Sequence, residues 1–323
     1  MKFFSDMNKL SLIHESGTYG NTSGTEWYVG MIQEHTPTEN VNVIPIRYQG
    51  SNDRNVDTFV DGNLDYTGTF NFFPQDMRFL GLAIGSTFET TAAGSHVISE
   101  VNNNVSSYNI PNQSLSSFTL KDYKISNTTG SNFIRQYGGC LVNSLTLTAT
   151  QGDIVNCEVG YIAQSSTFSS GANIGISGTL TTRPYMFSDV SLQIPSGTAI
   201  DNVTELSLSI NNNIEPGHFL TGSRQIKEGL PLNRDYEMTT TMIMDNVNAK
   251  TFYDSYFIAG SEFNCLLKMQ GTTGSAYIIM SGCKLTDMSI PSPLDSVQEN
   301  TMTIIPQHIS ASIHDAVVDY LAW

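Results

Sequence analysis

Residues 141–163, LVNSLTLTATQGDIVNCEVGYIA, decide the fold class of this chain. Two Thr-rich and apolar stretches, 141–150 and 154–163, flank the turn-forming residues 151–153, and this is the pattern of a β-hairpin. Side chains on one face of a strand recur every second residue. On the second strand of this hairpin, one face carries Val155, Cys157, Val159 and Tyr161. The hairpin therefore has one apolar face, and Cys157 is a small core residue.

Strand patterns of this kind recur along the chain. Residues 204–210 alternate, with Leu206, Leu208 and Ile210 on the apolar face. A second hairpin is predicted over 263–280 with its turn at 271–274, and a further bend falls at 291–293. The chain is therefore predicted to be mainly β.

Helix signals are few. Residues 74–84 (PQDMRFLGLAI) begin with Pro and stop at Gly85, and residues 249–259 (AKTFYDSYFIA) stop at Gly260. Each stretch predicts one short helix. Residues 314–323 fit either a short amphipathic helix or a strand-like arm.

An internal repeat organises these elements. Arg54 precedes Asp65-Tyr66, and Arg224 precedes Asp235-Tyr236, with both features offset by 170 residues. Each Asp-Tyr pair starts a Thr-rich strand that leads to one of the short helices. Further on, residues 139–145 (GCLVNSL) and 282–288 (GCKLTDM) match at an offset of 143. We interpret the two halves as a duplication.

The first copy is longer than the second. The interval from Gly85 to Gly139 is 54 residues and that from Gly260 to Gly282 is 22, so the first copy carries 32 additional residues. Their place, at about 87–130, is rich in Ser, Asn and Thr, which predicts an extended loop or an extra hairpin. A Gly/Ser-rich stretch at 165–187 is the predicted boundary. The expected domains are 1–185, with the insertion, and 186–323.

Composition excludes several functional classes. The 323 residues contain 15 Lys and Arg against 30 Asp and Glu, a formal net charge of −15. A protein that binds nucleic acid through phosphates needs clustered cations, and this chain has no run of Lys or Arg. The N-terminus lacks a long apolar stretch and no segment is apolar for about 18 residues, so we expect neither a secretory signal nor membrane insertion by this chain.

No constellation for catalysis or metal binding is apparent. The chain contains no phosphate-binding glycine loop, no HExxH and no GxSxG, and its six histidines show no i, i+4 pair. The four cysteines include no CxxC, so we expect free thiols in a cytosolic protein. The acidic runs 52–57 and 61–65 fit solvated turns better than calcium loops. We expect no catalytic residue, cofactor or metal, although carboxylates on separate strands, as in a glycoside hydrolase, are the third interpretation.

What the sequence offers is a surface for self-association. Long Thr- and Ser-rich strands in a duplicated unit have edges whose unpaired backbone groups can bond to another copy. A ring of copies closes these edges and removes the aggregation hazard that they create. We therefore expect the principal partner of the chain to be the chain itself.

Several segments together resemble a known family. Residues 15–20 (ESGTYG), 27–30 (WYVG), 54–56 (RNV) and 66–70 (YTGTF) are similar to the N-terminal half of tail tube proteins of tailed bacterial and archaeal viruses. Similarity continues through the hairpin that starts at Gly139-Cys140, and through residues 203–210 into Gly222-Ser223-Arg224. The resemblance covers most of the chain, from residue 15 to about 305.

The resemblance implies two tandem β-sandwich or barrel-like tube domains, each with a short helix and a long β-hairpin. It further implies homotrimeric, pseudo-hexameric rings that stack into a tube for passage of double-stranded DNA. Tape measure, tail terminator and baseplate proteins are the other implied partners, and the implied location is the virion tail, after assembly in the host cytoplasm. The alternative is a β-sandwich receptor- or carbohydrate-binding tail component, which a concave cluster of exposed aromatic residues would favour.

DNA moves freely through a channel whose wall does not attract phosphates. Four acidic residues lie on or beside the strands expected to line such a channel, and we expect some of them to face it: Asp65, Glu205, Asp235 and Glu237. The alternative is that they are ordinary charges on the outer ends of strands.

Overall fold

A computed structural model describes residues 8–15, 19–28, 30–49, 54–77, 79–84, 86–92, 95–100, 115–125, 132–170, 183–244, 250–271, 274–291, 294 and 297–315. The chain is mainly β and its strands pair antiparallel, as the alternation predicted. Its first half contains β1 (Lys9–His14), β2 (Glu26–Tyr28), β3 (Met31–Ile46), β4 (Thr58–Phe73), α1 (Phe79–Ile84), β5 (Ser86–Ala92), β6 (Ser95–Glu100), β7 (Phe118–Lys124), β8 (Phe133–Thr150), β9 (Asn156–Ala163) and β10 (Ser165–Ser170).

The second half begins with a 3-10 turn, and the short helix predicted over 249–259 is a π-helix. Its elements are η2 (Phe187–Asp189), β11 (Val190–Gln193), β12 (Ala199–Ile200), β13 (Val203–Asn211), β14 (Ile214–Gly217), β15 (Glu228–Pro231), β16 (Asp235–Ile243), η3 (Phe252–Ile258), β17 (Phe263–Gln270), β18 (Gly274–Ser289), β19 (Glu299–Ile305) and β20 (His308–Asp315).

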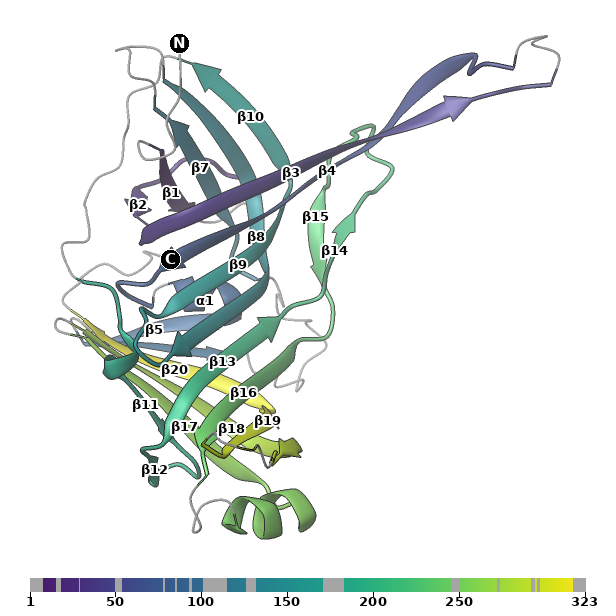
Figure 1. The fold of residues 1–323 in the computed structure, drawn as a ribbon. Coiled ribbons are helices and arrows are strands. Elements are labelled where there is room, and N and C mark those ends of the chain that lie inside the picture. The colour runs from purple at the N-terminus through teal and green to yellow at the C-terminus, as the bar shows by residue number, and fades with distance from the viewer. Residues whose placement is uncertain are drawn as a thin grey trace, which may run out of the picture.

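One sheet runs through both halves, and we call it the common sheet. Its order is β3–β4–β9–β8–β13–β16–β19–β18, with four strands from each half joined where β8 pairs with β13. We call this junction the seam. The β3–β4 hairpin forms one edge of this sheet, and Figure 1 shows it extending well beyond the rest of the fold.

A flanking sheet covers one face of each half. In the first half its order is β10–β8–β7–β1–β2, and in the second half it is β20–β18–β17–β11–β12. The long strands β8 and β18 each pass from the flanking sheet into the common sheet. Each half is thus two packed layers with the apolar core between them.

The core follows from the alternation seen in the sequence. Leu206, Leu208 and Ile210 on β13 are buried, whereas Glu205 and its alternating neighbours face the other way. In the β8–β9 hairpin, the apolar face of residues 155–161 is buried as predicted. All four cysteines are buried free thiols.

The predicted repeat appears in the strand register. β8 pairs with β9 through Leu145↔Val159, and β18 pairs with β19 through Met288↔Met302, both at an offset of 143. Each pairing is interrupted by a bulge at the same place, residue 143 in β8 and residue 286 in β18. Such bulges re-aim a strand, so a shared bulge indicates a shared bend. The two halves therefore share the same strand pairing, with the same bulge, in this part of the sheet.

The additional residues of the first half have two different roles. The β5–β6 hairpin extends the flanking sheet of the other half, because β6 pairs with β20. β7, in contrast, pairs with β8 as β17 pairs with β18, so β7 belongs to the repeated fold. The range predicted as an insertion, about 87–130, therefore spans one added hairpin and one shared strand, which is a correction to its C-terminal limit. Residues 101–114 lie outside the described part.

The stretch predicted to contain the boundary begins with a strand. Residues 165–170 form β10, because this stretch pairs with β8 despite its Ser-rich sequence. Residues 171–182 lie outside the described part of the chain. At the C-terminus, β20 ends at Asp315, and residues 316–323, for which a helix or an arm was expected, also lie outside it.

Gly139 and Gly282 test how strongly the repeated bend depends on glycine. Both have positive φ, +64° and +62°, and a Cβ on Gly139 would lie 2.7 Å from the Cβ of Gln164. We expect Gly139→Ala to destabilise the protein by about 2 kcal/mol or more, measured by urea unfolding, because it adds a clash to a left-handed backbone. Gly152→Ala is the control, since its φ is +84° but nothing lies within 4 Å. Equal losses for both variants would contradict the role of the contact.

Candidate functional site

The flanking sheets cover one face of the common sheet and leave the other face uncovered. Along β8, β13, β16, β19 and β18 this face carries hydroxyl, amide and carboxylate side chains, and we call it the polar face. One cross-strand row illustrates it: Thr150, Glu205, Thr241, Thr301 and Ser289 are successive register partners. Within this row the hydroxyl oxygens of Thr241 and Thr301 lie 3.2 Å apart.

Basic residues are nearly absent from the common sheet. β3, β4, β9, β13, β16 and β19 contain no Lys or Arg. Arg135 lies in the part of β8 that pairs with β10, where it forms an ion pair with Glu39. Lys284, on β18, lies near Glu262 and donates to the carbonyl oxygen of Gly260. The polar face is therefore a surface that does not attract phosphate groups.

The structure separates the four predicted acidic residues into two pairs. Glu205 and Glu237 are exposed on the polar face, on the adjacent strands β13 and β16. Asp65 is half-buried with its Oδ1 atom 2.8 Å from His218 Nε2, and Asp235 is exposed and accepts a hydrogen bond of 2.7 Å from Asn213 Nδ2. Asp235 is the first residue of β16, whereas Asp65 lies in the middle of β4, just before the part that pairs with β9.

Sequence reasoning missed further acidic residues on the same face. Glu34, Glu158 and Asp287 are exposed there, on β3, β9 and β18. The alternation along β9 could have identified Glu158, because it lies between the buried residues Cys157 and Val159. Glu34 and Asp287 required the register of their strands.

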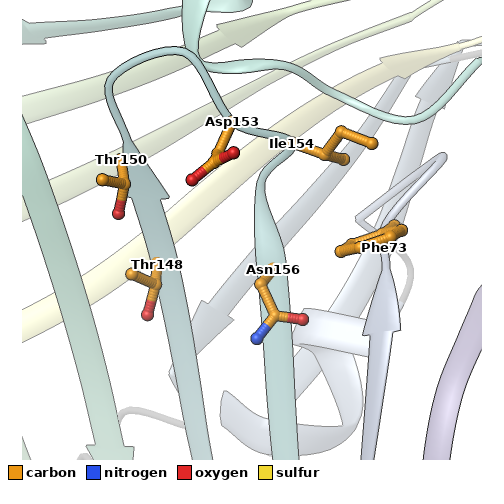
Figure 2. Close-up of a pocket in the computed structure, with 6 residues that line it drawn as sticks. All are labelled: Phe73, Thr148, Thr150, Asp153, Ile154 and Asn156. Atoms are coloured by element: carbon orange, nitrogen blue, oxygen red, sulfur yellow. The ribbon is translucent and has the colours of Figure 1, made fainter.

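A shallow hollow of about 380 Å³ lies at one end of the polar face, beside the β8–β9 turn. Figure 2 shows its lining: Phe73, Thr148, Thr150, Asp153, Ile154 and Asn156. Asp153 is the single ionisable side chain in this lining, so the hollow lacks the paired groups that acid–base chemistry needs. Among the described residues, no three His, Cys, Asp or Glu side chains are placed to hold a metal ion. Within the same part of the chain, no helix is long and apolar enough to cross a membrane.

The common sheet ends in two free edges within the described residues. β3 pairs with β4 alone, and the last part of β18, Lys284 to Ser289, pairs with β19 alone. Such edges expose unpaired N–H and C=O groups and are templates for another strand. Pro37, which has no N–H, lies on β3, as is usual for prolines in edge strands.

A buried polar network holds the edge strand β3 against the core. His35 Nδ1 lies 3.0 Å from Asp122 Oδ2, and His35 Nε2 lies 2.8 Å from the Tyr161 hydroxyl. Lys124 Nζ is 2.8 Å from the same Asp122 oxygen. Burial alone would raise the pKa of Asp122, but the hydrogen bonds from His35 and Lys124 outweigh it and hold that pKa below its usual value.

At the seam inside the chain, Asn212 provides a second buried polar anchor. Its Nδ2 donates to the carbonyl oxygens of Ala83, at 2.9 Å, and Val142, at 2.8 Å, and its Oδ1 accepts from Arg234 Nε at 2.7 Å. The Asn212 backbone N–H donates to Asn143 O at 2.8 Å. The seam is therefore fixed by side-chain bonds as well as by the strand ladder.

These features define a mainly β protein of packed antiparallel sheets, whose described residues present strand edges and a polar sheet face. A family model described as phage tail tube protein matches residues 8–313, nearly the whole chain. The chain belongs to this family, which confirms the resemblance drawn from its sequence, and the family places it in the virion tail. No curated protein matches it. The family match gives no support to the receptor- or carbohydrate-binding alternative.

Replacing Asp122 tests the network behind β3. We expect Asp122→Asn to lower the free energy of unfolding by about 2 to 4 kcal/mol at pH 7, because it removes a buried charged acceptor. A carboxylate with a depressed pKa stabilises the fold above its unfolded pKa, and this contribution is lost as pH falls below about 4. The deficit of the variant should therefore shrink in denaturation curves recorded below about pH 4.

The matched control for this experiment is Asp201→Asn, a change at an exposed carboxylate before β13. It should alter stability by less than about 0.5 kcal/mol across the same pH range. A deficit of Asp122→Asn that stays constant down to pH 3 would contradict the assignment.

Proposed function

We propose that the chain is a tail tube subunit that assembles into trimeric, pseudo-hexameric rings, and that it has no catalytic role. The observation that carries this proposal is the seam, where β8 of one half pairs with β13 of the other. The two free edges are the repeat equivalents of the strands that pair at the seam: β3 corresponds to β13, and β18 corresponds to β8. The proposed domains are residues 1–185 and 186–323, with the seam between them.

The equivalence of the edges rests on register. β13 pairs with β16 as β3 pairs with β4, at offsets of 171 and 170 residues, and even the bulges at Thr204 and Gln33 coincide. β8 corresponds to β18 at an offset of 143. The seam pair Asn211↔Ser144 therefore predicts a pair between Asn40 of one copy and Asp287 of the next.

Ring closure uses this repetition. If each junction between copies repeats the seam, each added half is rotated by the same angle. The resemblance to tail tube proteins implies the number, six halves or three chains in a closed ring. A closed ring leaves no free edge in the common sheet, which is the way that barrels avoid unlimited edge-to-edge growth. Stacked rings then form the tube.

The polar face is the proposed lumen wall. The other face of the common sheet packs on the apolar core. In the proposed ring the polar face therefore lines the channel, and the flanking sheets cover the outside. Hydroxyl, amide and carboxylate groups leave passing duplex DNA without a cationic partner. We propose that Glu205 and Glu237 face the lumen, and that Asp65 and Asp235 lie nearer its rim.

The remaining partners follow from the tube. A tape measure protein would occupy the lumen during assembly in the host cytoplasm, and terminator or baseplate proteins would cap the open ends. The chain itself inserts into no membrane in this proposal. Double-stranded DNA is a transient, non-specific occupant.

Blocking one edge tests the ring. By its equivalence to Asn212, the N–H of Val41 faces the free edge of β3, so Val41→Pro removes a donor that the isolated chain does not use. We expect this variant to form at least tenfold fewer rings in negative-stain microscopy, with mass measurement giving three chains per wild-type ring. Val41→Ala keeps the N–H and is the control. Equal ring yields for the two variants would contradict edge pairing at β3.

Reversing charge on the polar face tests the lumen. Tubes of Glu205→Lys/Glu237→Lys should retain short duplex DNA at low salt and release it as salt rises, because lysines supply the missing phosphate contacts. Wild-type tubes should retain none. The control, Glu215→Lys/Glu228→Lys, makes the same change of charge on β14 and β15, away from the common sheet. Equal retention by control and test tubes would place Glu205 and Glu237 outside the channel.

A further inference from the structure

The two long hairpins of the chain are equivalent but differ in what they touch. We call residues 41–64 the first arm and residues 212–234 the second arm. Their registers coincide: Val43↔Asp61 matches Ile214↔Pro231. Their turns close with the same backbone bond, Asp57 N to Ile46 O at 3.0 Å and Lys227 N to Gly217 O at 2.9 Å.

The second arm is seated on the first half of its own chain. Its side chains Ile214 and Ile226 join a separate apolar cluster with residues of the first half: Leu115, Leu141 and Ile162. Gln164 Nε2 also donates to the carbonyl oxygen of Lys227 at 2.8 Å. Only 7% of Ile214 and 9% of Ile162 remain exposed.

Polar contacts fix the same seat. His218 Nε2 lies 2.8 Å from Asp65 Oδ1, and Arg224 Nε donates to Gly62 O at 2.6 Å. The backbone N–H of Leu64 donates to Arg224 O at 2.9 Å. The second arm thus lies across the base of the first arm, as Figure 1 shows for β14 and β15 beside β3 and β4.

Within the described part of the chain, the first arm and the second half do not make the matching contact. The first arm runs straight away from the fold (Figure 1), and 44% of Val43 and 64% of Phe59 are exposed. On the second half, Ile305 is equivalent to Ile162, yet it is 43% exposed. Among the described residues, Val43 and Ile305 are therefore both uncovered, whereas their counterparts Ile214 and Ile162 are covered. The counterpart of Leu141 is Lys284, so the apolar part of this second seat is Ile305.

We propose that the first arm of one copy docks on the second half of the next copy, repeating the seat of the second arm. The offsets assign its contacts: Val43 packs on Ile305, Arg47 takes the place of His218 opposite Asp235, and Arg54 takes the place of Arg224. The occupant of the seat is a second copy of this chain. This inference rests on the proposed ring and specifies a contact that strand pairing alone does not require.

The residues that occupy the equivalent positions on the first arm and the second half can make polar contacts between copies. Arg47 and Asp235 have opposite charges and are both exposed, so docking brings a permanent cation to a carboxylate where the chain itself uses a histidine. Gln307 corresponds to Gln164 and can donate to the carbonyl oxygen of Asp57, as Gln164 does to Lys227.

The first arm must bend to reach this seat. The second arm leaves its sheet at Asn212 and Asn213, and the φ of Asn213 is positive, at 46°. At the equivalent place the first arm has a bulge between Val41 and Val43, opposite residues that include Gly62. A bulge is where a hairpin bends with little loss of pairing. The bend of the docked arm is therefore located at this bulge.

Cross-linking tests the docked position. All four native thiols are buried, so cysteines introduced by Val43→Cys/Ile305→Cys are the accessible ones. Treating assembled rings with a short bis-maleimide should give denatured species of two and three chains, and neither single variant should give them. The control Val43→Cys/Ile279→Cys, in which residue 279 is 42% exposed on β18 but lies outside the proposed seat, should give no such species.

A charge exchange gives an independent readout. Arg47→Asp and Asp235→Arg should each raise the protein concentration needed for ring formation at least tenfold, and the double variant should restore most of it. Rings that form normally in the double-cysteine variant without cross-links, together with single charge variants that assemble as wild type does, would overturn the docking. Absence of any wild-type ring would overturn the proposed function, and this inference with it.

Discussion

The structure depends on one strand pairing, the seam between β8 and β13. This pairing turns two four-stranded units into one sheet and fixes the rotation between them. A sheet that is built by repeating a unit must either continue, be blocked or close on itself. Here the outermost strands present the same register that the seam has already satisfied. In the proposed ring, the free edges of one chain therefore pair with those of the next in the register of the seam.

The two halves reach the same backbone by different chemistry. Behind β13 the core contact is apolar, Leu206 and Ile304, whereas the equivalent positions behind β3 are His35 and Tyr161 with buried Asp122. A strand at the edge of a monomer lacks a neighbour on one side, and directional hydrogen bonds hold it in register where packing from two sides is missing. At the seam, conversely, Asn212 adds polar anchoring that its counterpart Val41 does not provide. The internal junction is thus more strongly specified than the proposed external one.

Much of this could be predicted from local sequence, and the failures have physical causes. Alternation identified β13 and the β8–β9 hairpin, because one face of each is buried and the other is open. The full length of β3 was not foreseen, since Pro37 and Pro45 obscure its pattern, and both lie where an edge strand tolerates them. The pairing of β6 with β20 depends on contacts between distant residues, which no local pattern contains. Glu205 lies opposite the apolar face of β13, as the alternation of residues 204–210 predicted, whereas the position of Glu237 beside it is set by the register of β16, and the partners of Asp65 and Asp235 by the arms.

The pairing of β6 with β20 has a mechanical consequence. A hairpin that belongs to the first half by sequence completes a sheet of the second, and the common sheet crosses between the halves a second time at the seam. Besides their covalent connection, the halves are therefore joined at the seam, at β6–β20 and at the seat of the second arm. A force that pulls on one half is transmitted to the other through these contacts. The boundary that is visible in the sequence is thus not a line of weakness.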